Sequence, residues 1–565
     1  MIPCPHCRST NVRGHGTDRA KCYDCNRSFN RHGVVKRTTH LEQRPDTRCP
    51  SCGTIGRHRI AVNRGKYREM SCASCGVRFR DDRAAVQESA GDHPVYVITA
   101  AVNDSPVHTA FLRALRVYCD TRKARLIVIP VRYKNPTSDR ETDRLYQWAP
   151  VLSPWIVDKR LRICDGLQVL ADIKIQPTAV DPLSGLDTIT GTDCGIFGHT
   201  KIALRSIATR GHELPKLLLT TGAVTRPSYS DTKAGKKGEF HHVCGATVVE
   251  VDGGTFHLRH VHAAADGSFI DLDRRYSPKG VTAAPPAIAL VMGDLHAERH
   301  DPSVLVATGE ILATLKPKRL VLHDVLDFGA ASHHNSWWDR FSRRITGRDK
   351  VIDELRETCE LIDALHRNGQ ETVIVSSNHN DHLARWLADH RNGDDVQNAA
   401  IYHAAKSAVI QAIERGKGLL PNIFEVVARP MLKRPATFLG DRDSMTVAGI
   451  ELAYHGDKGP NGARGSAKAF DRIGAKSIIG HSHSPAIVGG CFQTGTSSLL
   501  NMGYNVGPSS WLHSHVVVYA SGKRSHIHII GGSWRAGSKR NGQGTHPKAA
   551  SNATARKGRR SRAAA

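Results

Sequence analysis

The stretch that decides the fold reads Ala287-Ile288-Ala289-Leu290-Val291-Met292-Gly293-Asp294-Leu295-His296. Its apolar run predicts a buried strand over Ala287–Met292, and a polar Asp-x-His group follows where that strand ends. Helices are predicted further along, over Val304–Leu315 and Val351–Leu365, between strands of the same kind. This alternation predicts an α/β fold whose functional residues lie at strand ends.

Four more predicted strands end in similar polar motifs. They are Arg319–Leu322 before His323 and Asp324, Thr372–Ser376 before Asn378 and His379, Ile450–Tyr454 before His455, and Lys476–Ile479 before His481 and His483. The carboxyl edge of an open α/β sheet is where ligands bind. Imidazole, carboxylate and amide donors without thiolate suit manganese, iron or zinc. The five motifs together predict a centre of two divalent metal ions that could clamp a phosphate.

In this order the motifs resemble those of the calcineurin-like metallophosphoesterase superfamily, whose signature runs DxH, GDxxD, GNH(D/E), H and GHxH. The resemblance covers roughly residues 286–530. It implies a sandwich of two mixed β-sheets flanked by helices, and two catalytic metal ions, with manganese preferred and iron or zinc as alternatives. It assigns Asp294, His296 and His483 to one ion, Asn378, His455 and His481 to the other, Asp324 to a bridge between them, and His379 to protonation of the leaving oxygen.

Three positions depart from this signature. His323 and Ser377 stand where the family has glycine, and Asn380 displaces the acidic residue expected after His379 to Asp381. No metal ligand is lost, but the surroundings of His379 differ from the pattern. The candidates for the substrate rim are His323, His333, His334 and Asp381, and the stretch from Asp327 to His334 could equally be a polar loop that touches nothing.

The cysteines predict a separate module at the N-terminus. Eight of the 14 fall in the first 75 residues, as two sets of paired Cys-x-x-Cys turns: Cys4, Cys7, Cys22 and Cys25, then Cys49, Cys52, Cys72 and Cys75. Two such turns give a closed tetrathiolate site for a structural zinc ion. We therefore expect two zinc ribbons, over residues 1–40 and 41–80, each with one zinc. Interleaved basic residues favour nucleic acid over protein as their partner.

The net charge of +26 is concentrated near the two ends of the chain. Residues 1–92 carry 18 Lys and Arg against nine Asp and Glu, and the stretch after Gly532 carries nine basic residues and no acidic one. Such clustering suits a polyanion such as DNA, because each neutralised phosphate releases counterions. Residues 533–565 are interpreted as a basic disordered tail. The alternative to DNA binding is that this tail only keeps the protein soluble.

The remaining segments complete the expected domain order. Residues 81–94 are interpreted as a linker, 95–285 as a mixed α/β middle domain and 286–532 as the metallophosphoesterase domain. The lysine- and glycine-rich segment 233–242 is interpreted as a surface loop. The alternative is a loop that contacts phosphate, but the segment lacks the P-loop pattern.

No apolar run approaches the roughly 20 residues that span a bilayer, and the first residues do not form a signal peptide. We therefore expect no membrane span and a cytoplasmic protein. Whether it forms a homo-oligomer stays open.

Three function classes compete: a nuclease acting on DNA, a small-molecule or protein phosphatase, and a non-catalytic DNA-binding protein. The basic ends favour the nuclease. The segments 129–136, 220–225 and 236–242, ahead of the metal motifs, are similar to those of tailed-phage DNA transfer proteins of the first-step-transfer type. That resemblance implies a phage protein in the host cytoplasm, tied to DNA transfer or host DNA degradation, with phage or host proteins as further partners. It leaves open endo- or exonuclease action and strand preference.

Overall fold

The computed structural model describes most of the chain from residue 88 onward and parts of the chain before it. The described residues are 3–4, 7–14, 19–25, 28–30, 41–42, 49, 51–52, 58–63, 68–72, 74–81, 88–133, 148–210 and 214–538. The expected linker lies partly outside this set, and most of the expected basic tail lies outside it. The chain divides into two compact units, Met1–Gln87 and Glu88–Ala565, which we describe separately.

The first unit contains two small antiparallel sheets, one for each set of cysteines. The first sheet has the order β1-β2-β3 and the second the order β4-β5-β6-β7. Their bounds are Val12–Gly14, Arg19–Cys22 and Ser28–Asn30 for β1 to β3, and Leu41–Glu42, His58–Asn63, Arg68–Ser71 and Arg78–Asp81 for β4 to β7. Hairpins of this kind present paired Cys-x-x-Cys turns to a common point, as the sequence predicts.

In the second unit, a six-stranded sheet carries three of the predicted motifs. Its order is β24-β23-β22-β21-β30-β31, with β21 to β24 parallel and β30 and β31 antiparallel. The bounds are Ala289–Val291, Arg319–Leu322, Glu371–Val375 and Thr437–Leu439 for β21 to β24, Ser514–Val518 for β30 and Arg524–His528 for β31. The strand Arg319–Leu322 matches its sequence prediction to the residue.

A second sheet, of eleven strands, carries the other two motifs. Its order is β25-β26-β27-β29-β28-β14-β15-β13-β12-β11-β8. The bounds are Glu88–Ser89 (β8), Arg160–Cys164 (β11), Leu167–Leu170 (β12), Cys194–Phe197 (β13), Leu204–Ile207 (β14), Lys216–Thr220 (β15), Thr446–Val447 (β25), Ile450–Glu451 (β26), Lys476–Ile479 (β27), Ala486–Val488 (β28) and Cys491–Gln493 (β29).

The two sheets share one buried core, so they pack face to face. Val291, Val321 and Val373 of the six-stranded sheet belong to the same apolar cluster as Ile450 and Ile478 of the eleven-stranded sheet. Side chains alternate across a strand, which leaves the opposite face of the six-stranded sheet for helices. The fold is thus mixed α/β, with several mixed sheets and with helices, which confirms the predicted fold class.

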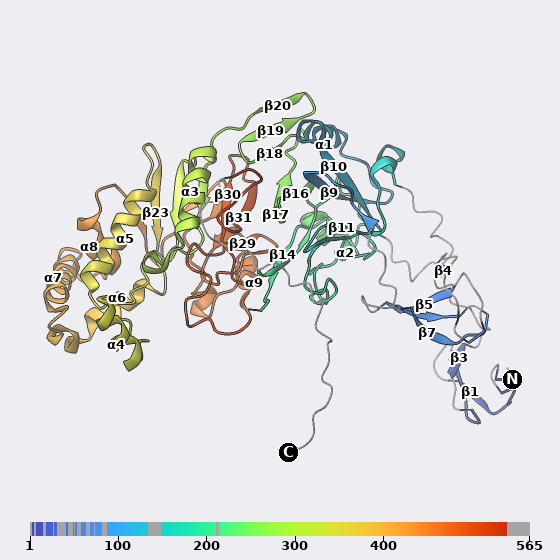
Figure 1. Ribbon diagram of the computed structural model, residues 1–565, viewed down its shortest axis with the longest axis horizontal. Helices are drawn as coiled ribbons and strands as arrows, with labels where there is room; N and C mark the ends of the chain where they lie inside the picture. The colour runs from blue at the N-terminus through green and yellow to red at the C-terminus, as the bar shows by residue number, and fades with distance from the viewer. Residues whose placement is uncertain are drawn as a thin grey trace, which may run out of the picture. The chain divides into compact units, whose positions relative to one another are not determined.

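Helices cover that opposite face and bury a second apolar core. In Figure 1 the helices α5, α6, α7 and α8 gather on one side of β23. The helices of this region are α3 (Pro302–Leu315), α4 (Trp337–Thr346), α5 (Val351–Leu365), α6 (Asn380–Ala388), α7 (Ala399–Arg415), α8 (Ile423–Ala428) and α9 (Ala467–Phe470). Asp301 caps α3 by accepting the Ser303 backbone N–H, and Ser336 and Asp339 form a capping box on α4.

A four-stranded sheet with the order β10-β9-β16-β17 packs against helix α1, next to a three-stranded sheet β18-β19-β20. The bounds are Val95–Val102 (β9), Thr109–Arg122 (α1), Ala124–Val131 (β10), Gly245–Asp252 (β16), Thr255–His262 (β17), Phe269–Asp271 (β18), Arg274–Ser277 (β19) and Gly280–Ala283 (β20). Arg259 of β17 is buried here and forms ion pairs with Glu250 (2.8 Å) and with Asp271.

The structure differs from the sequence interpretation in three places. Strands of residues 95–285 and of residues 286–532 share the eleven-stranded sheet, because β14 pairs with β28, so these segments form one unit. Segment 233–242 is not a loop: Lys233–His241 is helix α2, capped by the Thr232 hydroxyl on the Gly235 N–H. The tail begins later than Gly532, because Trp534 is buried and its Nε1 donates to Glu310 at 3.2 Å.

Candidate metal centre

The loops that follow β21 and β22 run side by side and carry the first ligands. The backbone N–H groups of Leu295 and His296 donate to the carbonyls of His323 (3.0 Å) and Asp324 (2.8 Å). The hydrogen bonds between β21 and β22 thus continue beyond the ends of the strands and hold the two loops against each other. As a result Asp294, His296 and Asp324 point to one place, as their positions at strand ends predict.

Four buried side chains form the first donor group. Ligand atoms of Asp294, His296, Asp324 and His483 all lie within 4.8 Å of one another. Nε2 of His296 lies 3.1 Å from Nε2 of His483 and 3.4 Å from Oδ2 of Asp324, and Nε2 of His483 lies 3.2 Å from Oδ2 of Asp294. Two imidazole nitrogens that face each other beside two carboxylates form a donor set suited to a divalent ion.

The second group lies on the other side of Asp324. Nε2 of His455 is 3.5 Å from Oδ2 of Asp324, the same oxygen that faces His296. The rings of His455 and His481 are 5.3 Å apart, and Nδ1 of His481 lies 3.1 Å from Oδ1 of Asn378. The structure thus brings all seven predicted metal ligands together, with one oxygen of Asp324 between the two groups.

Several polar atoms at this centre lack a hydrogen-bond partner, within the part of the chain that the structure describes. Both carboxylate oxygens of Asp294, Oδ1 of Asp324 and both ring nitrogens of His455 are buried without a hydrogen bond. A buried carboxylate without a partner is strongly destabilising unless a cation compensates it. The unsatisfied donor atoms therefore fit metal ions.

Carboxylates dominate the electrostatics around His455. Burial lowers the pKa of His455, but Asp324 and Asp294 outweigh burial and raise this pKa to about 9. Burial likewise raises the pKa of Asp324, yet the imidazoles of His379, His455 and His296 hold it well below its usual range. A site that stabilises positive charge to this degree is suited to binding cations.

Backbone strain is concentrated at the same residues. His296, Asp324, His481 and His483 all have φ between 44° and 71°, a region that non-glycine residues rarely adopt. Gly480 approaches the centre so closely that a Cβ atom there would lie 2.2 Å from Oδ1 of Asp294. Strained backbone that presents ligands is typical of functional sites.

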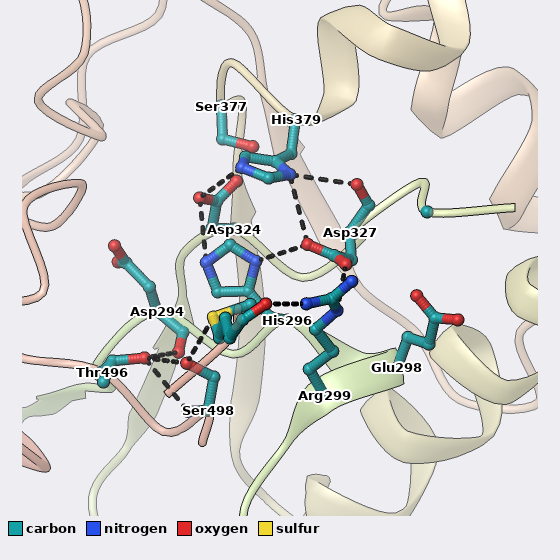
Figure 2. Close-up of polar contacts among 12 residues, drawn as sticks. Asp294, His296, Glu298, Arg299, Asp324, Asp327, Ser377, His379, Thr496 and Ser498 are labelled. Carbon is teal, nitrogen blue, oxygen red and sulfur yellow. Dashed lines mark hydrogen bonds and ion pairs between the residues drawn. The ribbon is translucent and has the colours of Figure 1, made fainter. Parts of the chain in front are cut away.

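Asp327 organises two of the histidines, a role that the sequence analysis missed. Figure 2 shows its carboxylate between His296, His379 and Arg299. Oδ1 lies 3.1 Å from Nδ1 of His296 and 3.5 Å from Nδ1 of His379, and Oδ2 lies 3.3 Å from Nε of Arg299. Burial raises the pKa of Asp327, but the hydrogen bond from His296 and the nearby cations bring it down to about 2. The last Asp of the GDxxD pattern, which Asp327 matches, could have signalled this residue.

His379 stands at the edge of the centre, at the start of α6. Its Nδ1 lies 3.0 Å from the backbone oxygen of Asp327, and its Nε2 lies 3.9 Å from Oδ2 of Asp324. A carbonyl oxygen can only accept, so Nδ1 carries the hydrogen and Nε2 faces the metal ligands. The displaced acidic residue Asp381 does not support His379, because it pairs with Lys458 at 3.1 Å.

A cavity of about 1500 Å³ opens above the centre, lined by Asp324, Asn378, His379, His481 and His483 among others. Of the predicted rim residues, His334 lines it, and His333 is exposed beside His334 at a ring distance of 3.9 Å. His323 does not reach the rim. It is fully buried and stacks on His455, which corrects its sequence interpretation.

The eight N-terminal cysteines form two compact groups. The Sγ atoms of Cys4 and Cys25 are 3.6 Å apart and those of Cys7 and Cys22 are 3.5 Å apart. In the second group the corresponding distances are 3.7 Å for Cys49 and Cys75 and 3.6 Å for Cys52 and Cys72. Tetrahedral zinc–thiolate geometry places sulfurs roughly 3.8 Å apart, so each group could hold a structural zinc ion.

These features define an α/β protein with a buried centre of histidines and carboxylates that can hold metal ions. No protein-family model matches the chain. The chain is 34% identical over 462 residues to Protein A1 of Escherichia phage T5, and the match covers 78% of this chain and 83% of that protein. The chain therefore belongs to the family of this phage protein.

The chain has only a weak structural likeness to the solved structure of Flavobacterium johnsoniae chitobiase. It has a TM-score of 0.17 and 10% identity, and the match spans 68% of this chain and 56% of the chitobiase, which is too weak to inform the fold. Among the described residues, no helix is long and apolar enough to cross a membrane.

Proposed function

We propose that this protein is a two-metal phosphodiesterase that cleaves DNA, and that it serves DNA transfer or host DNA degradation in phage infection. One observation carries the proposal. Oδ2 of Asp324 lies 3.4 Å from Nε2 of His296 and 3.5 Å from Nε2 of His455, with a donor group on either side. A carboxylate between two donor groups is the arrangement expected of a bridge between two cations.

The donor chemistry supports two divalent ions. Asp294, His296 and His483 would hold one ion, Asn378, His455 and His481 the other, with Asp324 between them. Nitrogen and oxygen donors without thiolate favour manganese, with iron or zinc as alternatives. When bound, such ions would neutralise a phosphate and lower the pKa of a water molecule between them.

His379 is the candidate general acid. The Asp327 carbonyl holds its Nδ1–H at 3.0 Å, which leaves Nε2 directed to the centre. Protonated at Nε2, the ring can donate its proton to the oxygen that leaves phosphorus. The Asp327 carboxylate also lies 3.5 Å from Nδ1, on the same side of the ring.

The cavity favours a polymeric substrate. Its volume of about 1500 Å³ exceeds the range of about 300–1,000 Å³ that is typical of small-molecule sites. Its lining includes the basic residues Arg348, Arg464 and Lys468, which suit phosphates on either side of the scissile one. Tyr504 and Trp511 also line it, with ring centroids 5.8 Å apart, and offer aromatic faces to bases.

Membership in a phage protein family supports the biological setting of the proposal. In this setting the reaction would take place in the host cytoplasm. The first ribbon also offers a surface for DNA, because Arg13 and Lys21 lie 5.6 Å and 5.9 Å from the ring centre of the exposed Tyr23. Cations beside an exposed aromatic ring suit nucleic acid.

The test is digestion of linear and circular DNA by purified protein with Mn²⁺, next to hydrolysis of p-nitrophenyl phosphate. We expect DNA cleavage that a chelator abolishes and that Asp324→Asn abolishes. Asp353→Asn, at a half-exposed carboxylate on α5, is the matched control and should leave cleavage unchanged. Hydrolysis of the monoester without cleavage of any DNA would replace the nuclease by a phosphatase, and inactivity on both would favour a DNA-binding role.

A further inference from the structure

Three histidines outside the metal centre meet at the mouth of the cavity. His333 and His334 come from the loop between β22 and α4, and His382 comes from the first turn of α6. Their ring centroids are 3.9 Å apart for His333 and His334, 4.9 Å for His333 and His382, and 5.3 Å for His334 and His382. Each offers a ligand atom within 4.8 Å of the others. None of the three belongs to the two-metal centre.

The buried ring of His382 is a second, independent observation that indicates a bound ion. Only 9% of this residue is exposed, yet its Nδ1 atom is buried without a hydrogen-bond partner among the described residues. A buried nitrogen that lacks a partner is destabilising, and a bound cation would satisfy it. His333 and His334 are exposed, so their side chains can rotate toward the roughly 3.4 Å nitrogen separation of a tetrahedral site.

We propose that His333, His334 and His382 form a third metal site, which takes a borderline cation such as Zn²⁺. Three neutral imidazoles without a carboxylate suit zinc rather than manganese or magnesium, which prefer oxygen donors. His334 and His382 line the cavity, so the fourth position is open to water or to a phosphate oxygen there. The site is independent of the proposed reaction, because it shares no ligand with the two-metal centre.

Arg385 sets the affinity of this site. Its Nη1 lies 3.1 Å from Nε2 of His333, so the guanidinium donates to a nitrogen that the ion would need. A fixed positive charge beside a cation site also repels the ion. Arg385 is exposed, so its side chain can move away from His333 when a metal ion binds. Replacing Arg385 should nevertheless increase the affinity of the site for the ion.

The test is titration of the metal-free full-length chain with Zn²⁺ in competition with a chromophoric chelator. We expect His334→Asn to bind one equivalent less than the unchanged chain, or the same equivalent with affinity reduced by more than about tenfold. Arg385→Gln should bind that equivalent about tenfold more tightly. His403→Asn, at an exposed histidine of α7 outside the cavity lining, is the matched control and should match the unchanged chain.

Two comparisons separate this site from the others. The eight N-terminal cysteines are the same in every variant, so their zinc contributes equally to each titration. Asp324→Asn, which removes the bridge of the two-metal centre, should retain the His334-dependent equivalent even if the enzyme is inactive. Identical isotherms for the unchanged chain, His334→Asn and Arg385→Gln would overturn the proposal.

Discussion

The carboxylate of Asp327 lies 3.1 Å from Nδ1 of His296, so the ring donates its Nδ1–H to this buried acceptor. The bond leaves Nε2 of His296 directed at Asp324 and His483, where a bound metal ion would take the place of a proton. A carboxylate–histidine pair of this kind orients a metal ligand and increases its basicity. Asp327 thus acts on the proposed metal through His296, as a positioning residue.

We therefore expect Asp327→Asn to weaken metal binding without removing a ligand. The amide accepts a weaker hydrogen bond and brings no negative charge, so Mn²⁺ affinity should fall by about 10- to 100-fold. Electron paramagnetic resonance of unbound Mn²⁺ during a titration measures this directly. Asp353→Asn, at a half-exposed position of α5, should retain full affinity. Equal affinity in all three proteins would show that Asp327 does not support a metal ligand.

His379 should be essential for turnover and dispensable for metal binding. Its Nδ1 is held by the Asp327 carbonyl and its Nε2 lies at the edge of the centre, 3.9 Å from Oδ2 of Asp324, so we expect it to act as an acid rather than a ligand. His379→Ala should lower kcat by about 10²- to 10⁴-fold. Metal content, measured by mass spectrometry, should stay unchanged. Loss of metal together with activity would instead make His379 part of the binding site.

Local periodicity predicted much of what positions the centre. The helix Val351–Leu365 and the strands Arg319–Leu322 and Lys476–Ile479 have the predicted bounds, because each buries a regular apolar face. The seven predicted ligands lie close together, although they come from two facing sheets. Asp327 and His323 were misjudged because their roles depend on which side of the loop each side chain takes, and sequence spacing does not determine that.

Longer-range features could not be read from the sequence. The pairing of Leu204 with Ile487 joins segments 283 residues apart, and no local pattern indicates it. Helix α2 is not evident from the sequence, since Gly235 and Gly238 weaken helix propensity. Both glycines are buried, and a Cβ atom at Gly235 would lie 2.0 Å from the backbone oxygen of Ser230. Close packing, which is tertiary, outweighs propensity there.

The buried ion pairs of Glu250 should make stability depend on pH. Arg259 and Arg122 approach its Oε1 at 2.8 Å and 2.6 Å, and the Ala536 N–H donates to Oε2 at 3.0 Å. Burial raises the pKa of Glu250, but Arg259 outweighs burial and lowers it far below the usual value. A lowered pKa contributes stability above the unfolded pKa of about 4.3, and this stability is lost as the pH falls further.

Glu250→Gln should therefore lower the free energy of unfolding by about 3–5 kcal/mol at neutral pH, because Arg259 stays charged but loses one of its carboxylate partners. The difference in melting temperature between the two proteins should shrink below about pH 4.3, where the unchanged chain loses the same contribution. Calorimetry at pH 7 and at about pH 3, well inside the range over which the contribution is lost, measures both effects. Glu360→Gln, at an exposed position of α5, is the control. A difference that persisted unchanged at low pH would contradict the ion-pair account.

The first cysteine module, the predicted zinc ribbon, should contribute to DNA affinity through Tyr23 and its two neighbouring cations. Tyr23→Ala removes the exposed ring, which is 55% exposed, without touching a cysteine. We expect a loss of about 1–3 kcal/mol in binding to single-stranded DNA, the usual contribution of one aromatic–base stack. Fluorescence anisotropy with labelled oligonucleotides measures it, and Tyr23→Phe should restore binding. Equal affinity of the alanine variant would assign the ribbon to another partner.

Removal of residues 539–565 should weaken DNA binding and flatten its salt dependence. The truncation starts after Ser538 and not after Gly532, because the residues up to Ser538 pack against the rest of the second unit through buried Trp534. The removed segment carries eight Lys and Arg and no acidic residue. Each phosphate that the shortened chain no longer neutralises should reduce the slope of log affinity against log salt by about 0.7–0.9. A full-length chain with these eight residues changed to Gln should match the truncated protein, whereas retention of the full slope would show that the segment does not bind DNA.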